Sequence, residues 1–525
     1  MAAPGGGRAS PRSDLRSPRL RSTGRRARDT AQFSGSWLSE ARGSCAEKAH
    51  NVTISPSIEP ALLTQGPSGR SPDLEESRSI HLVGAGGAGM NAIGLVLAEM
   101  GHGVSGSDLR AGPGMTRLAA HGAQVMIGHD AANIGSADIV AHSSAVPQGN
   151  VELVEARRRG IPVLSRAELL SGICRRKQTL AVGGTHGKTT TSSMLALCLV
   201  AAGEHPSFLV GGEVNEIGSG AVWDTAGEWF VVEADESDGT FLALGADAVV
   251  VTNIEPDHLD HYGSFDELAA AFEAFAGNAG GPRIVCADDQ RAAAMAERIG
   301  GCVTYGTVPH SDYRITDMHS SRTGAGFELS NGTTSIGRCE LPLPGLHNVT
   351  NAAGALAAAL ELGAAATPMI DALGRFAGVS RRFERRGERD GVSFIDDYAH
   401  LPTEVAAAIA AARSGGWKRI VAVFQPHRYS RTAALWQDFA DSFADADQVV
   451  LTGIYGAGEL ALPGVSAELV LGALLDSHPY ASVAYLPGRT ELRSYLRTNL
   501  RPGDLCLTLG AGDLTTLPDE LLHVA

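Results

Sequence analysis

From residue 80 onward, the chain alternates between short apolar runs and longer stretches whose apolar residues recur at helical spacing. This alternation predicts α/β units with parallel sheets. Nearly every apolar run ends in glycine, an acid, His or Asn. Because ligands bind beyond the carboxyl ends of strands in open α/β sheets, these polar endings predict where a ligand lies. The predicted strands include SIHLVG, TLAVGG, WFVVEAD, DAVVVTN, RIVCAD, RIVAVFQP, DQVVLTG and DLCLTLGAG.

Residues 1–78 differ in composition from the rest of the chain. They are rich in Arg, Ser, Gly and Pro and poor in apolar residues, so they cannot bury enough surface to offset the entropy lost on ordering. We predict a disordered Arg/Ser-rich tail, or a start codon assigned too far upstream; a transit peptide is the alternative. The full length of 525 residues suggests three or four domains.

Charge, cysteine usage and hydropathy exclude several classes of protein. The formal net charge of −15 argues against a general nucleic-acid binder, which needs a basic surface. The seven cysteines form no CxxC pair, which is typical of a reduced cytosolic chain rather than a disulfide framework or a zinc site. No apolar run approaches the roughly 18 residues that a membrane span requires. We therefore expect a cytoplasmic protein with no membrane insertion and no nucleic-acid partner.

The first candidate site is a glycine-rich loop after the first predicted strand. Gly84, Gly86 and Gly89 have G-x-G-x-x-G spacing between a strand and a helix, and Asp108 follows 19 residues after Gly89. This pattern fits a dinucleotide fingerprint. The same turn can hold another diphosphate at a helix N-terminus, or serve tight packing alone. At this level NAD, another phosphate ligand and plain packing remain open.

A second glycine-rich loop, GGTHGKT, precedes the helical run that starts at Lys188. The strict P-loop pattern fails because Val182 stands where its first glycine is expected. Backbone N–H groups and a helix N-terminus can still face an anion. Lys188, one of only four lysines in the chain, could reach the outer phosphates, and Thr189 could bind Mg²⁺. The alternative is a glycine-rich turn with a solvated lysine.

Acids and a histidine follow two further predicted strands. Glu233 and Asp235 end one strand, and Asp257 and His258 follow another. Mg²⁺ prefers oxygen ligands and keeps several waters, and cations neutralise charge in phosphoryl transfer. We expect Thr189, Glu233 and His258 to bind metal. Each acid taken alone could instead cap a helix or lie solvated in a loop.

Nine segments together resemble the Mur ligases, in order along residues 79–525. That family resemblance implies three α/β domains: a Rossmann-like domain at 79–174 for the UDP-sugar, a central P-loop ATPase domain with a mainly parallel sheet at 175–379, and a Rossmann-like domain at 380–525 that brings the amino acid. The segments are HLVGAGGAGM, GGTHGKTTT, EADESDGTFL, TNIEPDHLDHYG, LPGLHNVTNAAGAL, GVSRRFERRG, DDYAHLPTEV, FQPHRYSRT and LGAGDL.

The resemblance also implies a reaction. ATP phosphorylates the lactyl carboxylate of UDP-N-acetylmuramate, and the amine of L-alanine then attacks the acyl phosphate, giving an amide, ADP and phosphate in peptidoglycan synthesis. Mg²⁺ assists. The first glycine loop would then face the UDP diphosphate and not NAD. We expect a monomer or weak homodimer.

Site residues follow from the resemblance by motif position. The expected ATP-binding residues are Gly183, Gly184, Thr185, His186, Gly187, Lys188, Thr189, Thr190, His347, Asn348, Asn351, Asp397 and Tyr398. The expected UDP-sugar-binding residues are Gly86, Gly87, Gly89, Asp108, His129, Ser143 and Ser144. The expected catalytic residues are Lys188, His258, Arg382, His400, Arg428 and Arg431. His400 is a candidate base for the amine, against a structural or ribose-contacting role.

Two features bear on the branch of the family. Relatives that add later residues use a carbamylated lysine in the central domain, and no lysine lies between Lys188 and Lys418 here. This favours the alanine-adding branch; Glu273 could supply a carboxylate instead, unless it is an exposed helix acid. Leu401 replaces an expected histidine and Gly453 an expected aspartate, so amino-acid choice or rate could differ.

Three rival functions remain at this level. A recycling ligase attaches a ready-made tripeptide to the same sugar nucleotide. A nicotinamide oxidoreductase would use the first glycine loop, but it leaves Lys188, Glu233 and His258 unexplained. A ligase-like protein that binds nucleotides without turnover would not need Arg428 and Arg431.

Overall fold

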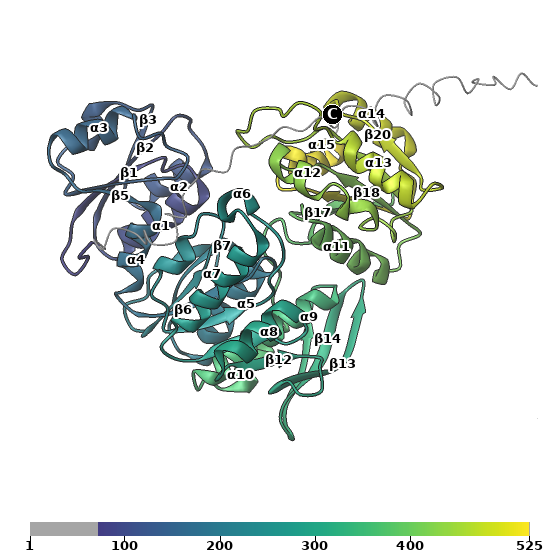
Figure 1. Ribbon diagram of the computed structural model, residues 1–525, viewed down its shortest axis with the longest axis horizontal. Helices are drawn as coiled ribbons and strands as arrows, with labels where there is room; N and C mark the ends of the chain where they lie inside the picture. The colour runs from purple at the N-terminus through teal and green to yellow at the C-terminus, as the bar shows by residue number, and fades with distance from the viewer. Residues whose placement is uncertain (1–71, 524–525) are drawn as a thin grey trace, which may run out of the picture. The chain divides into compact units, whose positions relative to one another are not determined.

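The first of three α/β units in the computed structural model, which describes residues 72–523, is a five-stranded parallel sheet of order β3-β2-β1-β4-β5 (Figure 1). The order reverses between β1 and β4, where such sheets open a crevice for ligands. Its strands are β1 (Ser79–Val83), β2 (Gly103–Asp108), β3 (Gln124–Ile127), β4 (Ile139–His142) and β5 (Val163–Ser165). Its helices are α1 (Ala88–Glu99), α2 (Pro113–Ala120), α3 (Val151–Arg158) and α4 (Arg166–Cys174).

The second unit is a ten-stranded sheet of order β15-β14-β13-β12-β11-β10-β6-β9-β7-β8. The strands from β12 to β7 in this order run parallel, while β13–β15 and β7–β8 form antiparallel pairs. The strands are β6 (Gln178–Gly183), β7 (Ser207–Val214), β8 (Ser219–Val222), β9 (Trp229–Glu233), β10 (Ala248–Val251), β11 (Arg283–Cys286), β12 (Val303–Gly306), β13 (Tyr313–Ser321), β14 (Gly324–Asn331) and β15 (Thr334–Leu341). The helices are α5 (Lys188–Ala202), α6 (Leu259–Tyr262), α7 (Phe265–Gly277), α8 (Gln290–Ile299), α9 (Leu346–Glu361) and α10 (Ala366–Leu373).

The third unit is a six-stranded sheet of order β16-β17-β21-β18-β19-β20, parallel except for the edge strand β16. The strands are β16 (Glu384–Arg389), β17 (Val392–Asp397), β18 (Arg419–Phe424), β19 (Gln448–Leu451), β20 (Val483–Tyr485) and β21 (Asp504–Leu509). The helices are α11 (Pro402–Ser414), α12 (Tyr429–Leu435), α13 (Glu468–Ser477), α14 (Arg489–Asn499) and α15 (Leu517–Leu522).

Helices α5 and α9 pack together in the core of the second unit. Their small side chains let the two backbones come close, and all α9 residues from Ala352 to Ala359 are buried. A Cβ at Gly354 would lie 2.7 Å from the ring of Tyr305, so this position must be glycine for the helix to pack there. The alanine-rich stretch of α9 thus anchors the helix that begins at Lys188.

The expected α/β class with three sheet-containing units is confirmed, and all eight strands named from sequence are present. The antiparallel hairpins β13–β15 and β7–β8 were not foreseen. They extend a parallel sheet at its edges, where hairpin strands need no crossover helix. The predicted tail at 1–78 lies almost wholly outside the described residues, so it stays a prediction, as do the exact domain boundaries.

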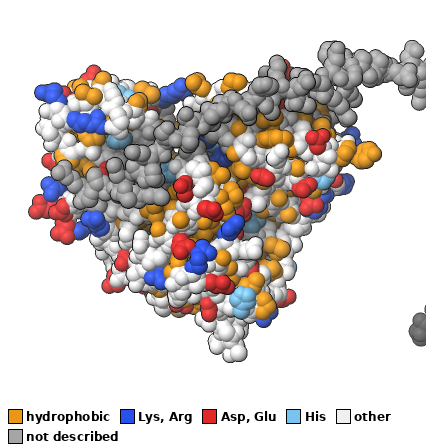
Figure 2. Space-filling model, viewed as in Figure 1, with side chains coloured by type: hydrophobic (Ala, Val, Ile, Leu, Met, Phe, Trp, Pro, Cys, Tyr) orange, Lys and Arg blue, Asp and Glu red, His pale blue; other side chains and the backbone are white. Residues whose placement is uncertain are grey.

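Within residues 72–523, no helix is long and apolar enough to cross a membrane. On the face seen in Figure 2, acidic and basic side chains are interspersed.

Replacing Leu356 by alanine should destabilise the second unit, because Leu356 is fully buried between α9 and its neighbours. Large-to-small substitutions at such sites cost about 2–5 kcal/mol. Calorimetric melting would measure the loss. Val200→Ala on α5, where the side chain is 45% exposed, is the control and should change stability by less than about 0.5 kcal/mol. An equal effect of both substitutions would contradict the packing described.

Candidate active site

At the turn from β6 into α5, the first N–H groups of the helix have no partner within the helix. Gly184 and Gly187 both have positive φ, 135° and 78°. A Cβ at Gly184 would lie 2.0 Å from Thr252 Oγ1, and one at Gly187 would lie 2.4 Å from Asn351 Oδ1. Only glycine satisfies both the conformation and the close approach. The unpaired N–H groups at the start of a helix form an anion-binding site.

Lys188 lies folded across this loop. Its Nζ donates to the carbonyl of Gly184 at 2.7 Å and to Glu236 Oε1 at 2.8 Å. Burial opposes the charged form of Lys188, but Glu236 and Asp235 raise its pKa above the ordinary value. Burial raises the pKa of Glu236 to about 7, against the lowering effect of Lys188. The loop therefore carries a charged ammonium group within reach of any phosphate that it binds.

Thr189 and Glu233 face one another beside the loop. Thr189 Oγ1 donates to Glu233 Oε1 at 3.1 Å, and the N–H of Gly211 donates to the other carboxylate oxygen at 2.7 Å. Two oxygen ligands of this kind suit Mg²⁺, which takes one or two protein groups together with phosphates and waters. In the described part of the chain no three His, Cys, Asp or Glu side chains group closely enough to hold a metal alone.

The predicted metal ligand His258 contacts an acid. The backbone of His258 has a φ of 53° and occupies the N-cap position of α6. The Nε2 atom of His258 lies 3.2 Å from Asp257 Oδ2. Burial lowers the pKa of His258. The ring is therefore neutral at pH 7, the form that binds metal ions.

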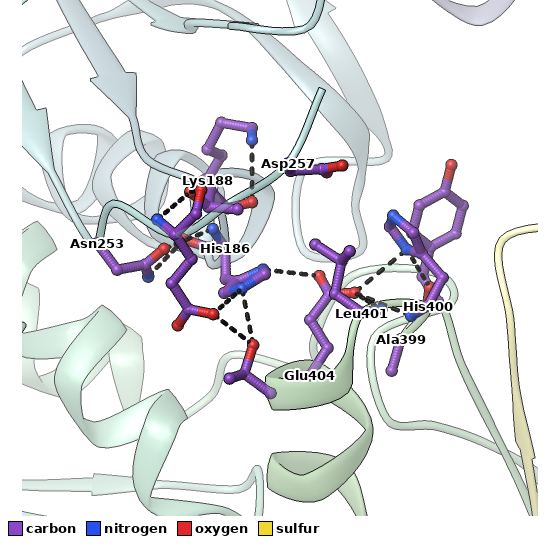
Figure 3. Close-up of polar contacts among 12 residues, drawn as sticks. His186, Lys188, Asn253, Asp257, Ala399, His400, Leu401 and Glu404 are labelled. Atoms are coloured by element: carbon purple, nitrogen blue, oxygen red, sulfur yellow. Dashed lines mark hydrogen bonds and ion pairs between the residues drawn. The ribbon is translucent and has the colours of Figure 1, made fainter. Parts of the chain in front are cut away.

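His186, from the same loop, reaches α11 of the third unit (Figure 3). Its Nδ1 lies 3.2 Å from Glu404 Oε1, and its Nε2 lies 3.0 Å from Thr403 Oγ1 and 3.2 Å from Glu255 Oε2. Burial disfavours the charged ring, but Glu255 and Glu404 raise its pKa to about 9. His186 is thus an imidazolium whose two N–H groups are both accepted.

A cavity of about 330 Å³ lies between the phosphate loop and α11. This size suits a small-molecule ligand. Both units line it, and the lining includes seven of the residues expected at ATP together with the expected catalytic residue Arg382: His186, Gly187, Thr190, His347, Asn348, Asn351 and Asp397, with Arg382. The structure therefore brings most of the expected nucleotide residues together around one space.

Burial shifts the pKa values of His347 and Asp397, which both line this cavity. It lowers the pKa of His347 to about 4, with Arg382 acting in the same direction. It raises the pKa of Asp397 to about 6, although Arg382 opposes this. Asp397 accepts from the N–H groups of Phe383 and Ala399, both at 2.7 Å, and so holds the segment that carries Arg382. The guanidinium of Arg382 lies over the ring of Tyr398, 4.9 Å from its centre.

Arg431 and Arg428 differ in their surroundings. Arg431 forms a buried ion pair with Asp257, Nη2 to Oδ1 at 3.1 Å, and donates to His427 Nδ1 at 2.9 Å. Arg431 was expected to bind substrate, but in this structure its guanidinium group is already paired with Asp257. Arg428 has φ of 68°, and its Nε is buried without a hydrogen-bond partner. One donor of the Arg428 guanidinium group is thus left without a partner.

His427 was missed by the sequence analysis, although it stands beside Arg428 in the HRYSRT segment. Because arginine only donates, His427 Nδ1 must accept from Arg431, which leaves the proton on Nε2. Burial lowers the pKa of His427 to about 3. Its ring lies 5.7 Å from that of His400 and stacks on Tyr455 at 5.8 Å.

His400 is held by its Nδ1, which lies 3.0 Å from the carbonyl of Tyr398. Burial lowers the pKa of His400 to about 4, although Glu404 opposes this. The neighbouring Leu401 is buried and its N–H donates to Glu404. Gly453 lies near Pro487.

The residues expected at the UDP-sugar gather at the carboxyl ends of the first sheet. The N–H of Gly86 donates to Asp108 Oδ2 at 2.9 Å, so Asp108 shapes the loop itself. Gly87 caps α1, and a Cβ at Gly89 would lie 3.1 Å from Arg166. Ser143 and Ser144 follow β4, and Ser143 lies against Gly84. These positions surround the point where the strand order reverses.

His129 is held by an acid that sequence reasoning missed. Its Nδ1 lies 3.0 Å from Ser107 Oγ and 3.3 Å from Glu152 Oε2. Glu152 is fully buried, and burial alone would raise its pKa; contacts with His81, Ser107 and Asn133 lower it to about 2. Glu152 stands in a helical pattern with no motif around it, so the sequence carried no signal for it.

The Glu273 hypothesis is not supported by the geometry. Glu273 is 40% exposed on α7 and pairs with Arg298 Nε at 2.8 Å. This is the exposed helix acid that the alternative interpretation expected.

Three family models match the chain in order. They are described as the Mur ligase family catalytic domain, over residues 79–178, the Mur ligase middle domain, over 182–359, and the Mur ligase glutamate ligase domain, over 381–512. Together they match well over half of the chain.

The chain belongs to the Mur ligase family.

Curated Mur ligases are similar to this chain over most of its length. A UDP-N-acetylmuramate–L-alanine ligase of Pelotomaculum thermopropionicum is 42% identical over 456 residues, or 86% of this chain and 98% of that protein. A protein of the same name from Rubrobacter xylanophilus is 44% identical over 447 residues, or 84% of this chain and 99% of that protein.

Solved Mur ligase structures share the fold. A UDP-N-acetylmuramate–alanine ligase of Thermotoga maritima matches with a TM-score of 0.72 at 28% identity, covering 85% of this chain and 98% of that chain. A murein peptide ligase of Psychrobacter arcticus matches with a TM-score of 0.64 at 23% identity, covering 86% of this chain and 100% of that chain, and supports the fold alone. Membership of this family identifies the protein as a ligase. The roles of its individual residues stay predictions.

His186→Gln should remove an alkaline dependence of stability from this Mur ligase. The folded pKa of about 9 lies above the unfolded value of 6.5. The stabilisation is therefore fully present below pH 6.5 and is lost as the pH rises through 9, with a size of about 1–3 kcal/mol. Calorimetric melting from pH 6 to 10 should show a parent-to-variant difference that shrinks with pH. His310→Gln, at an exposed position, is the control. A difference that does not change with pH would contradict the charged state assigned to His186.

Proposed function

We propose that this Mur ligase joins L-alanine to the lactyl carboxylate of UDP-N-acetylmuramate in peptidoglycan synthesis, with hydrolysis of ATP to ADP and phosphate. The observation that carries the proposal is the 42–44% identity, over nearly the whole length, to proteins named for this reaction. The geometry supports it, because the phosphate loop opens on a cavity that a second domain closes.

The proposed reaction has two balanced steps. A carboxylate oxygen of the sugar attacks the γ-phosphorus, the bond to the β-phosphate oxygen breaks, and ADP leaves. The alanine nitrogen then attacks the acyl carbon, the acyl C–O bond breaks, phosphate leaves, and the nitrogen loses a proton. The substrate carboxylate is the nucleophile, so the protein needs none of its own. Catalysis then consists mainly of positioning and charge neutralisation.

Lys188 is proposed to bind the outer phosphates. Its Nζ lies over the loop carbonyls, and its partner Glu236 is held with a raised pKa. Phosphate oxygens would replace Glu236 as the partner of Lys188. When bound at Thr189 and Glu233, Mg²⁺ would neutralise phosphate charge.

Arg428 and Arg431 are proposed to act on the reacting groups from the third domain. A small cavity lined by Asp257, His258, Arg428 and Arg431 joins the two domains there. Arginine suits a transferring phosphoryl group because its planar fork binds two oxygens at once. Arg428 would bind a carboxylate through its unpaired Nε, while Asp257 orients Arg431.

His400 is proposed to accept the proton of the alanine ammonium group. Because its Nδ1 lies 3.0 Å from a carbonyl oxygen, that nitrogen carries the hydrogen, which leaves the lone pair on Nε2. The low pKa keeps the ring neutral at pH 7.

The first domain is proposed to hold UDP at Gly86, Gly87, Gly89, His129, Ser143 and Ser144. We further propose a cytoplasmic monomer or weak homodimer. The cysteines support the compartment, since Cys174, Cys198, Cys286, Cys302, Cys339 and Cys506 are all free thiols.

Phosphate release should depend on both UDP-N-acetylmuramate and an amine. With ATP and Mg²⁺ present, we expect release with L-alanine and little without an amine, because the acyl phosphate is shielded from water once the domains close. Parallel assays with glycine, L-serine and the tripeptide measure selectivity, and NADH should have no effect. Faster turnover with the tripeptide than with L-alanine would indicate the recycling reaction.

Lys188→Ala should lower kcat on the order of 10²–10³-fold, because it removes a charged donor from the phosphates. Lys418→Ala, at a lysine that packs on Gly503, is the control and should keep parental turnover. Ligation by the Lys188→Ala protein at the parental rate would rule out the proposed phosphate site.

A further inference from the structure

Glu404 on α11 contacts two functional segments that come from different domains. Its Oε1 lies 3.2 Å from His186 Nδ1 in the phosphate loop. Its Oε2 accepts from the N–H groups of His400 at 2.9 Å and Leu401 at 3.1 Å. Figure 3 shows the carboxylate between His186 on one side and the His400 segment on the other. One side chain therefore touches both the ATP side and the amine side of the site.

Local structure at the start of α11 explains half of this arrangement. Pro402 occupies the first turn, and Leu401 before it has no side-chain acceptor for the free N–H groups. Glu404 Oε2 instead accepts from the N–H groups of His400 and Leu401, just before the helix, and so holds the chain where it enters α11. This task needs one carboxylate oxygen only. The second oxygen is left to point at the phosphate loop.

The other half crosses between the domains. His186 donates to Glu404 from Nδ1 and faces Glu255 Oε2 with Nε2 at 3.2 Å. Thr403 Oγ1, next to Glu404, donates to the same Glu255 oxygen at 2.7 Å. His186 and Glu404 are only 14% and 12% exposed. Charge pairs shielded in this way are screened less by salt than surface pairs.

The contact lies at the rim of the nucleotide cavity. His186 and Gly187 line the cavity from the loop, while Thr403, Glu404 and Ala408 line it from α11. If α11 moved away from His186, the cavity would lose that wall. The same movement would carry His400 away from the phosphate loop, because Glu404 holds the His400 backbone.

We propose that Glu404 is a positioning residue that docks α11 on His186 and thereby places both the wall of the nucleotide cavity and His400. This rests on the proposed function for its link to alanine, but the docking itself concerns nucleotide binding alone. Glu404 acts through its contacts with His186 and with the His400 segment.

Glu404→Gln separates docking from helix capping. The amide oxygen of glutamine can still accept from the N–H groups of His400 and Leu401, so the start of α11 is kept. The NH₂ group of glutamine would face the Nδ1–H group of His186, and since both are hydrogen-bond donors, the charged contact is lost. Arg413→Gln is the matched control, since Arg413 lies on the same helix and pairs with Asp447 inside the third domain.

Four proteins besides the parent decide the question: Glu404→Gln, His186→Gln, the double variant and Arg413→Gln. Calorimetric titration with ATP and Mg²⁺ gives Kd without turnover, and the ligation assay gives KM for ATP and kcat. Contacting residues couple in double-mutant cycles. We expect Glu404→Gln to weaken ATP binding about tenfold, and the double variant to be no more than about twofold worse than the weaker single variant.

Two results would overturn the proposal. One is ATP binding by Glu404→Gln equal to that of the parent and of Arg413→Gln. The other is a double variant whose loss equals the product of the two single losses, which would mean that His186 and Glu404 act independently. Melting transitions that begin well above the assay temperature exclude simple unfolding as the cause. Absence of ligation by the parent would contradict the proposed function and leave the binding cycle as a separate test.

Discussion

The turn between β6 and α5 is the constraint on which the rest of the site depends. Gly184 and Gly187 allow the backbone to pass within contact distance of Thr252 and Asn351, and α5 begins directly after them. The other residues of the candidate site are grouped around this turn. The alanine-rich helix α9 packs against α5 and brings His347, Asn348 and Asn351 to the same cavity. The packing of α9 against α5 in the core therefore also sets the positions of the residues that line the cavity.

Three of the cations expected at a charged substrate already have an acid beside them. Lys188 pairs with Glu236, Arg431 with Asp257, and His186 with Glu404 and Glu255. An unpaired buried charge is costly, so these acids hold the cations charged and oriented while no phosphate is bound. Exchange of an acid for a phosphate oxygen then costs less than burying a new charge.

The pairs also differ in what they join. Lys188 and Glu236 belong to one domain, so their contact shapes the loop alone. Arg431 with Asp257, and Glu404 with His186, join the second domain to the third. Buried charges in the candidate site therefore contribute to the contact between these two domains, beside contacts such as that of Arg322 with Trp417.

Sequence alone determined the α/β class, the two glycine loops and the acids at strand ends, because these depend on local spacing and on the rule that parallel strands end at one edge. It also determined the family, because nine short segments occur in one order. The division into three units came from the family resemblance. Only the tertiary structure decided which charges meet. Glu255 and Glu404 lie within recognised segments and Glu152 lies outside them, but in all three cases the partners lie on other elements of the fold, so the sequence did not show the contact. The antiparallel hairpins were not predicted from the sequence, and neither was the partner of Arg431. Pairing between distant segments depends on how whole domains pack and leaves no periodic pattern in the chain.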